Sequence, residues 1–112
     1  MLVNKNNYIE NTLIYHNKKY KEKKYSFQRK FPNEDVIRFI SKNMKFLKNN
    51  GRILDIGCGS GRHLKVLEEF GLKCDGLDFS REGLKLAKKI IKKKSTNLIL
   101  DNILDMSSLK KK

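Results

Sequence analysis

The feature that most constrains the fold is a glycine-rich stretch in the middle of the chain, Leu54–Gly61, which reads LDIGCGSG. Apolar residues precede it as in a short strand, and Leu64, Leu67 and Phe70 follow it at helical spacing. A turn of this kind presents backbone N–H groups at the positive end of a helix dipole. Glycine also permits positive φ angles and close approach of a ligand. The stretch therefore predicts a binding site for a nucleotide-like ligand with polar or anionic groups.

The spacing of the glycines distinguishes between two classes of nucleotide ligand. Gly57, Gly59 and Gly61 occupy every second position after Asp55, whereas the dinucleotide fingerprint is G-x-G-x-x-G. The next predicted strand ends at Asp78, an acid that can accept hydrogen bonds from both ribose hydroxyls of a nucleoside. This combination resembles motif I and the following region of class I S-adenosylmethionine-dependent methyltransferases, in particular those acting on small molecules. In the alternative interpretation, the glycines only turn the chain and the acid only caps the following helix.

The resemblance implies an α/β fold with a Rossmann-like open parallel sheet. The strands are predicted at 52–54, 73–77 and 97–100, in the spatial order 3-2-1. Only strands 1–3 of the family's seven-stranded fold are predicted, so strand 1 would be an edge open to pairing with another chain. The resemblance covers 32–106, and residues 32–112 are expected to form a partial methyltransferase domain, the cofactor-binding half. The chain would be a fragment, a truncated gene product or one half of a two-chain enzyme.

The resemblance also implies which residues would hold the cofactor, S-adenosylmethionine. Asp55 and the glycine turn would bind the methionine end, Asp78 the ribose hydroxyls, and Phe79 would flank the adenine. The full set of expected cofactor-binding residues is Asp55, Gly57, Cys58, Gly59, Gly61, Asp78, Phe79, Asn102 and Ile103.

Two alternatives remain open at the edge of the adenine, where the sequence after the third strand reads DNILDM. If Ile103 matches the family's pattern, Asn102 supplies the carbonyl that accepts from the adenine amine; otherwise Asp101 is the acceptor. No catalytic residue is identified, and neither His16 nor His63 is favoured as a base. The methyl acceptor, expected to be a small molecule, is not identified.

Residues 1–31 are predicted to be a polar N-terminal arm or lid. Ile9, Leu13 and His16 lie at helical spacing, so part of this segment should be helical. It would either rest on the domain or cover the cofactor and substrate. Further on, helices are predicted from Pro32 to about residue 50 and over 81–93.

The composition limits the remaining possibilities. With 112 residues the chain forms at most one domain. Its net charge of +14 permits contact with nucleic acid, but the lysines are spread along the whole chain, so an RNA-directed methyltransferase is kept only as an alternative. Cys58 and Cys74 form neither a metal site nor a disulfide framework and are predicted to be small buried residues. Without a signal peptide or a membrane-length apolar run, the protein is expected to be cytoplasmic.

Overall fold

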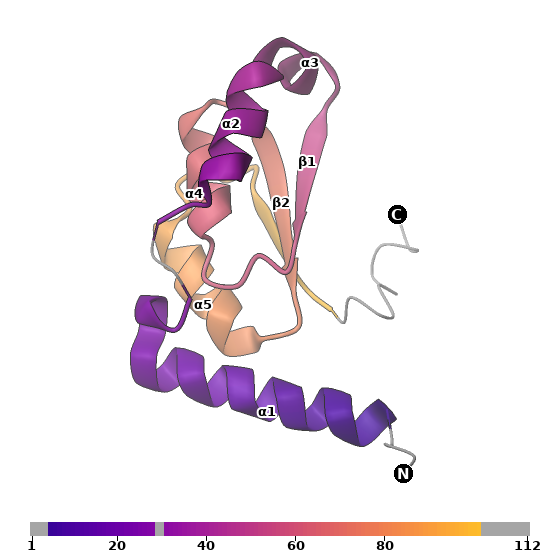
Figure 1. The fold of residues 1–112 in the computed structure, drawn as a ribbon, viewed down its shortest axis with the longest axis vertical. Coiled ribbons are helices and arrows are strands. Elements are labelled where there is room, and N and C mark those ends of the chain that lie inside the picture. Colours follow the sequence, from indigo (N-terminus) through magenta and orange to yellow (C-terminus); the bar gives the residue numbers. More distant parts are fainter. Residues whose placement is uncertain (1–4, 29–30, 102–112) are drawn as a thin grey trace.

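The centre of the molecule is a sheet of three parallel strands. The computed structural model describes residues 5–28 and 31–101, and within them β1 (Arg52–Ile56), β2 (Lys73–Asp78) and β3 (Asn97–Leu100) lie side by side in the order β1-β2-β3. The register pairs Asp55 with Gly76 and Leu77 with Ile99. The predicted strand order is therefore confirmed, with β1 at an edge of the described sheet (Figure 1).

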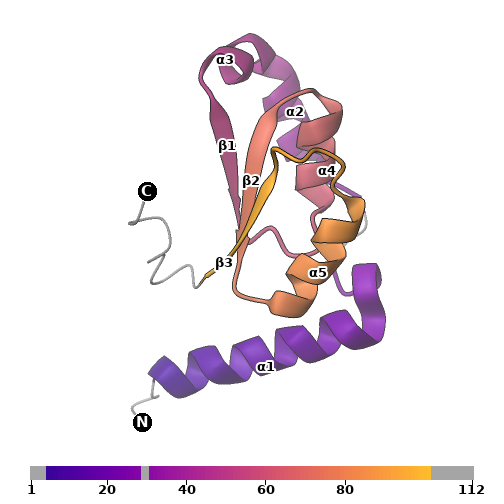
Figure 2. The same ribbon diagram turned by 180° about the vertical axis from the view of Figure 1, so that it is seen from behind.

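Helices cover one face of this sheet. The two strand-to-strand connections are α4 (Arg62–Glu69) and α5 (Arg81–Ile90), and α2 (Glu34–Lys42) and α3 (Met44–Asn49) precede β1. In both opposite views α2, α4 and α5 lie on the same side of the strands (Figures 1 and 2). The hydrophobic core between them and the sheet contains Ile40, Cys58, Leu64, Val66, Leu67, Leu72, Cys74 and Leu84. Both cysteine thiols are free and buried, as predicted.

No described helix lies over the opposite face of the sheet (Figure 2), and apolar side chains of β1 are exposed there. Leu54 and Ile56 of β1 are 38% and 44% exposed. The alternation along β1 explains this, because Ile53 packs against the core while its neighbours on either side are exposed.

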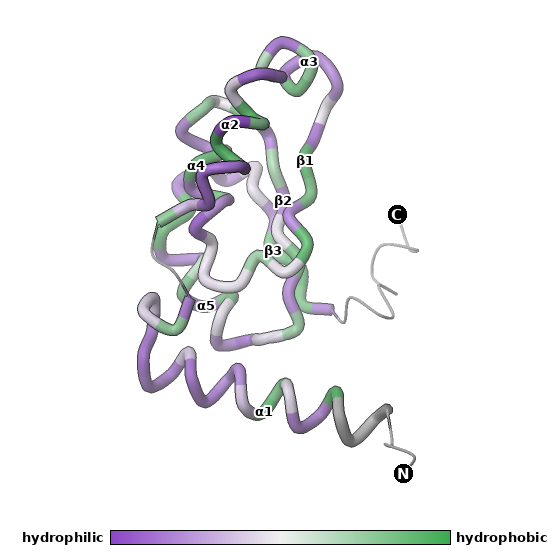
Figure 3. The backbone as a smooth tube through the Cα atoms, viewed as in Figure 1, coloured by the Kyte–Doolittle hydropathy of each residue, from purple (hydrophilic) through white to green (hydrophobic). Residues whose placement is uncertain are grey.

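The N-terminal segment is helical and lies across the carboxyl ends of the strands. α1 (Lys5–Lys23) and the short 3₁₀ turn η1 (Lys24–Ser26) pack mainly against α5. Figure 3 shows that α1 is hydrophilic over most of its length. Two tyrosines hold the segment on the domain. Tyr20 of α1 is only 4% exposed, and the hydroxyl of Tyr25 in η1 donates to the backbone oxygen of Leu86 (2.7 Å). No helix in the described ranges is long and apolar enough to cross a membrane.

Two helix boundaries differ from the prediction. The helix expected from 32 to about 50 is interrupted at Asn43, whose side-chain amide donates to the oxygen of Phe39 (2.8 Å) and so competes with the helical backbone. The helix expected over 81–93 ends at Ile90. It stops early because the N–H groups of Lys92 and Lys93 donate to the Glu68 carboxylate (2.8 and 3.0 Å) instead of continuing the helix.

An ion pair joins the strands at their amino ends. The Arg52 guanidinium of β1 donates to both carboxylate oxygens of Asp75 in β2 (2.9 and 2.6 Å), and Asp75 also accepts from the N–H and the side-chain amide of Asn97 in β3 (3.2 and 2.9 Å). The Arg52 hydrogen bond to this carboxylate lowers the pKa of Asp75 to about 2. The network fixes the register of all three strands and leaves their carboxyl ends to form the site.

Candidate functional site at the carboxyl ends of the strands

The glycine turn has the positive φ angles that its sequence predicts. The φ angles of Gly57, Gly59 and Gly61 are +76°, +53° and +90°, values that residues with a Cβ rarely adopt. The turn carries the chain from the end of β1 directly into α4. Three glycines are thus required by conformation alone, before any ligand is considered.

Backbone N–H groups at both ends of the turn are bonded within the protein. Those of Gly57 and Cys58 donate to the oxygen of Leu77 (2.7 and 3.0 Å), and that of Gly61 donates to the oxygen of Cys58 (3.0 Å). The Cys58 thiol points into the core, because a Cβ placed on Gly76 would lie 2.7 Å from its sulfur. Burial raises the pKa of this thiol well above its ordinary value. The donors expected to be free in this turn are therefore engaged.

Asp78 bridges the glycine turn and the start of α5. It is 7% exposed, and its carboxylate accepts from the N–H of Gly59 (2.5 Å) and from the N–H of Ser80 (3.1 Å). The N-cap of α5 is Ser80, whose hydroxyl accepts from the N–H of Gly83 (3.1 Å). A carboxylate has about four lone-pair positions, so Asp78 retains capacity to accept hydrogen bonds from a ligand.

Asp55 is a partly buried carboxylate whose Oδ2 has no hydrogen-bond partner among the described residues. Burial raises its pKa to about 6, the charge of Asp78 adds to this, and the charge of Arg62 opposes it. Arg62 donates through Nη1 to the oxygen of Phe31 (3.1 Å), but its Nε is likewise buried without a partner in the described part of the chain. Unsatisfied buried groups of this kind are costly, and a cationic ligand group would satisfy the carboxylate.

Phe79, expected to flank the adenine, packs against an aromatic cluster of the N-terminal segment. The ring of His16 meets it edge-on at a centroid distance of 5.2 Å, and Phe27 meets His16 at 5.5 Å. His16 is thus a packed histidine, and its Nδ1 lies 2.8 Å from the oxygen of Thr12. α1 therefore fixes one edge of the Phe79 ring.

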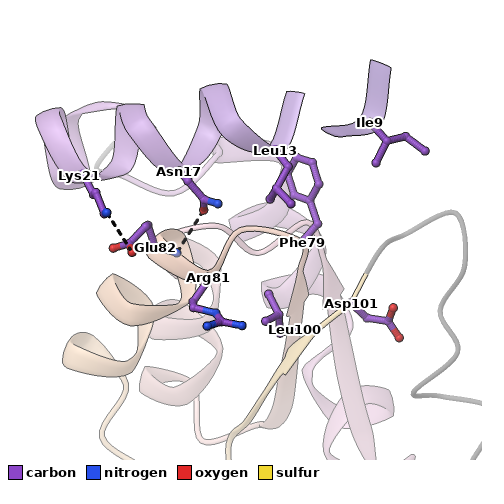
Figure 4. A pocket seen from close by; sticks show the side chains of 9 residues that line it. All are labelled: Ile9, Leu13, Asn17, Lys21, Phe79, Arg81, Glu82, Leu100 and Asp101. Carbon is purple, nitrogen blue, oxygen red and sulfur yellow. Dashed lines mark hydrogen bonds and ion pairs between the residues drawn. The ribbon is translucent and has the colours of Figure 1, made fainter. Parts of the chain in front are cut away.

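A pocket of about 530 Å³ opens between α1, the turn after β2 and the end of β3 (Figure 4). Its lining residues are Ile9, Leu13, Asn17, Lys21, Phe79, Arg81, Glu82, Leu100 and Asp101. Two residues that the sequence associated with the adenine, Phe79 and Asp101, thus line one pocket. Asn102 and Ile103 lie outside the described residues.

Several residues at the site were not identified from the sequence. The side-chain oxygen of Asn17 (Oδ1) accepts from the Ser80 hydroxyl (2.6 Å) and from the N–H of Glu82 (3.3 Å), and so joins α1 to the start of α5. Gln28 contacts the glycine turn through Ser60. Asn17 follows Leu13 by four residues on one helix face, a spacing that offered a signal; nothing comparable identifies Gln28.

His63 has a structural contact instead of a place in the pocket. Its Nε2 accepts from the N–H of Asn33 (3.0 Å), the N-cap residue of α2. Burial lowers the pKa of His63, and the charge of Arg62 lowers it further, so the ring is neutral around pH 7. A neutral ring can keep this acceptor role.

Comparison with known proteins relates this arrangement to one family. A family model described as a methyltransferase domain matches residues 27–105. Among solved structures, a SAM-dependent methyltransferase from Archaeoglobus fulgidus is similar over 78% of this chain and 37% of its own, with 24% identity and a TM-score of 0.52. The DhpI–SAH complex is similar over 87% and 46%, with 18% identity and a TM-score of 0.55.

A third structure, described by the conversion of a disulfide bond into a thioacetal group during echinomycin biosynthesis, is similar over 86% of this chain and 42% of its own, with 20% identity and a TM-score of 0.59. No curated protein matches the chain significantly. At these identities the solved structures establish the likeness of fold alone. The chain spans less than half the length of each of these three structures.

Proposed function

The chain belongs to the class I S-adenosylmethionine-dependent methyltransferase family, and we propose that it forms the cofactor-binding portion of an enzyme that methylates a small molecule. The observation that carries the proposal is the position of the D-x-G-x-G-x-G turn. It lies beside the Asp78 carboxylate, at the same edge of the sheet as the pocket lined by Phe79 and Asp101.

In this proposal the pocket takes the adenosine and the glycine turn takes the amino-acid end. Phe79 flanks the adenine ring, Asp78 accepts from the ribose hydroxyls, and Asp55 faces the cationic groups of the methionine end. The last assignment is supported by the Asp55 oxygen that no described residue contacts through a hydrogen bond, because a positive ligand group would supply this interaction. Asn102 with Ile103, or Asp101, meets the edge of the adenine.

The proposed reaction is a displacement at the methyl carbon. A nucleophilic atom of the acceptor forms a bond to this carbon with its electron pair, the carbon–sulfur bond breaks, and the electron pair of that bond stays on sulfur as S-adenosylhomocysteine leaves. The contribution of the protein is chiefly to hold the two reactants in line. We assign no base, since some nucleophiles attack without first losing a proton.

The N-terminal segment, 1–31, is proposed to act as a lid over the cofactor. Its contacts with Ser80, Glu82 and Ser60 support this role, since they join it to both elements that border the site. The buried free thiols of Cys58 and Cys74 fit a reducing compartment such as the cytoplasm.

We further propose that β1 pairs with additional polypeptide, either a continuation of this chain or a second chain. The support is the exposure of Leu54 and Ile56 and the open edge of β1 in the described sheet. A non-catalytic fragment or partner subunit is the alternative to an enzyme. Methyl transfer by the purified chain, alone and with a candidate partner, separates these possibilities.

An RNA-directed methyltransferase is a second candidate because of one charged hollow. A depression of about 510 Å³ between α1 and α5 is bordered by five lysines and by Glu82. The lysines are Lys21, Lys24, Lys85, Lys88 and Lys89. If this surface binds RNA, the affinity must fall steeply with salt concentration.

Isothermal titration calorimetry of the 112-residue chain with S-adenosylhomocysteine and with NAD tests the main proposal. We expect S-adenosylhomocysteine to bind and NAD not to bind at the same concentrations. Tighter binding of NAD would refute the assignment of the glycine turn.

A further inference from the structure

We propose that the glycine turn contains a carboxylate subsite and that the side-chain amide of Gln28 occupies it as an internal competitor of the ligand's amino-acid end. This inference rests on the proposed function, because it concerns how the same ligand enters. It assigns to Gln28 an effect opposite to that of a ligand-binding residue.

The Gln28 amide lies directly on the turn. Its Oε1 accepts from the N–H of Ser60 (3.1 Å) and from the Ser60 hydroxyl (2.9 Å), and Ser60 is only 3% exposed. A Cβ built on Gly59 would lie 2.6 Å from Oε1 and 2.7 Å from Nε2 of Gln28. It would also lie 2.5 Å from the Tyr20 hydroxyl. The space that the glycine leaves open is therefore filled by these two side chains.

The donors that hold this amide suit a carboxylate better than an amide. A planar carboxylate has the shape of a primary amide, and hydrogen bonds to its charged oxygens are about twice as strong as those to a neutral carbonyl. Arg62 follows two residues after Ser60, and its Nε–H is buried without an acceptor among the described residues. Its positive charge acts on both Asp55 and Tyr20, so it lies close to the same turn. Ser60 thus provides both donors that hold Gln28, and Arg62, which directly follows the turn, carries a further donor without an acceptor among the described residues.

The site is consequently closed at one end and hollow at the other. The pocket lined by Phe79 and Asp101 remains as a cavity of about 530 Å³, whereas the glycine turn is covered by Gln28 and Tyr20. A ligand that contains only the adenosine portion can enter the pocket without moving Gln28. A ligand that also carries the amino-acid carboxylate must displace it.

The displacement needs only a local movement. α1 is held independently, by Asn17 at the start of α5 and by the Tyr25 hydroxyl on Leu86. Gln28 follows three residues after Tyr25 and contacts the turn through its side chain. Rotation of this side chain is therefore sufficient to free the Ser60 donors.

Two substitutions at the same position separate a competitor from a ligand contact. Gln28→Ala removes the competitor, and we expect about tenfold tighter binding of S-adenosylhomocysteine, equivalent to about 1.4 kcal/mol. Gln28→Glu places a carboxylate on the same donors, and we expect weaker binding than in the wild type. Ser26→Ala is the matched control, because Ser26 lies in the same segment but its hydroxyl bonds only to the oxygen of Lys23 (2.7 Å) among the described contacts.

Calorimetry with two ligands makes the test specific. S-adenosylhomocysteine carries the amino-acid end, whereas 5′-deoxy-5′-methylthioadenosine lacks it. We expect Gln28→Ala to change the affinity for the first ligand and to leave that for the second unchanged. Circular dichroism of each variant verifies that the fold is kept.

The outcomes distinguish this inference from the proposed function. If both ligands bind the wild type but Gln28→Ala leaves the affinity for S-adenosylhomocysteine unchanged or lowers it, Gln28 is not a competitor and the inference is wrong. If neither ligand binds the wild type or the Gln28→Ala variant, the proposed function itself fails and the inference falls with it.

Discussion

Replacing Asp55 by asparagine should stabilise the ligand-free protein at neutral pH. The pKa of Asp55 is raised from 3.8 to about 6, so at pH 7 the folded protein carries a partly buried charge, one oxygen of which has no partner in the described part of the chain. A shift of about two pKa units corresponds to about 3 kcal/mol. Because the group is only partly buried, solvent screening reduces this figure, and we expect about 1–3 kcal/mol of added stability.

The sign of the pH dependence follows from the same shift. Between about pH 4 and pH 6 the folded state retains a proton on Asp55 that the unfolded state has already lost. Stability from this group therefore falls as the pH rises through that window and is constant above it. Between pH 5 and pH 7 the wild-type protein should lose at most about 1.4 kcal/mol of its free energy of unfolding through this group. The Asp55→Asn variant should lack this loss.

Urea unfolding of both proteins at pH 5 and pH 7 measures the effect. Asp35→Asn is the control, since Asp35 is an exposed acid at the start of α2 and its loss should lower stability slightly at both pH values. The reasoning would be refuted if Asp55→Asn were less stable than the wild type at pH 7, or if the two proteins showed the same pH dependence. The same variant should bind S-adenosylhomocysteine more weakly, since it lacks the negative charge that is proposed to face the cationic end of the ligand.

Three further predictions concern other charged and glycine positions. Asp78→Ala should lower cofactor affinity at least about tenfold. It should also cost about 1–3 kcal/mol of stability in urea unfolding, because the N–H of Gly59 loses its acceptor. Unchanged affinity would mean that Asp78 has only a structural role. Gly59→Ala should lower the thermal stability more than Gly57→Ala. Both glycines have positive φ, but of the two only Gly59 has side chains where the new Cβ would lie, with the nearest atom at 2.5 Å. Equal losses of stability in thermal unfolding would contradict this. Asp75→Asn should weaken the pairing with Arg52. Since the pKa of Asp75 is lowered from 3.8 to about 2, the stability advantage of the wild type in an acid titration should be full above about pH 5 and largely lost at pH 2. An advantage as large at pH 2 as at pH 7 would exclude this ion pair as its source.

The parts of the fold predicted from sequence are those fixed by neighbouring residues. The glycine turn follows from the positive φ angles that Gly57, Gly59 and Gly61 alone accept readily. The start of α5 follows from Ser80, whose hydroxyl caps the helix from within three residues. The strand order required the family resemblance, because periodicity alone does not specify which strands pair.

The parts that were missed depend on partners far apart in the sequence. The early end of α5 depends on Glu68, a residue more than twenty positions away that accepts from Lys92 and Lys93. In the same way, the contact of Gln28 with Ser60 spans 32 residues and involves no recognisable local pattern. Helix propensity and turn chemistry are local quantities, so they predict neither contact.

The departures from ordinary local structure gather at one place, and this argues for function there more strongly than any single residue does. Within a few residues the chain contains three positive-φ glycines, and the Oδ2 of Asp55 and the Nε of Arg62 are buried there without a partner among residues 5–28 and 31–101. The two unpartnered polar groups cost stability, and such costs persist where surrounding structure maintains them for another purpose. The amino ends of the strands differ in this respect, because there the guanidinium of Arg52 and the carboxylate of Asp75 bind each other through two hydrogen bonds and fix the register. The unsatisfied groups at the carboxyl ends are therefore best explained by a ligand that completes them.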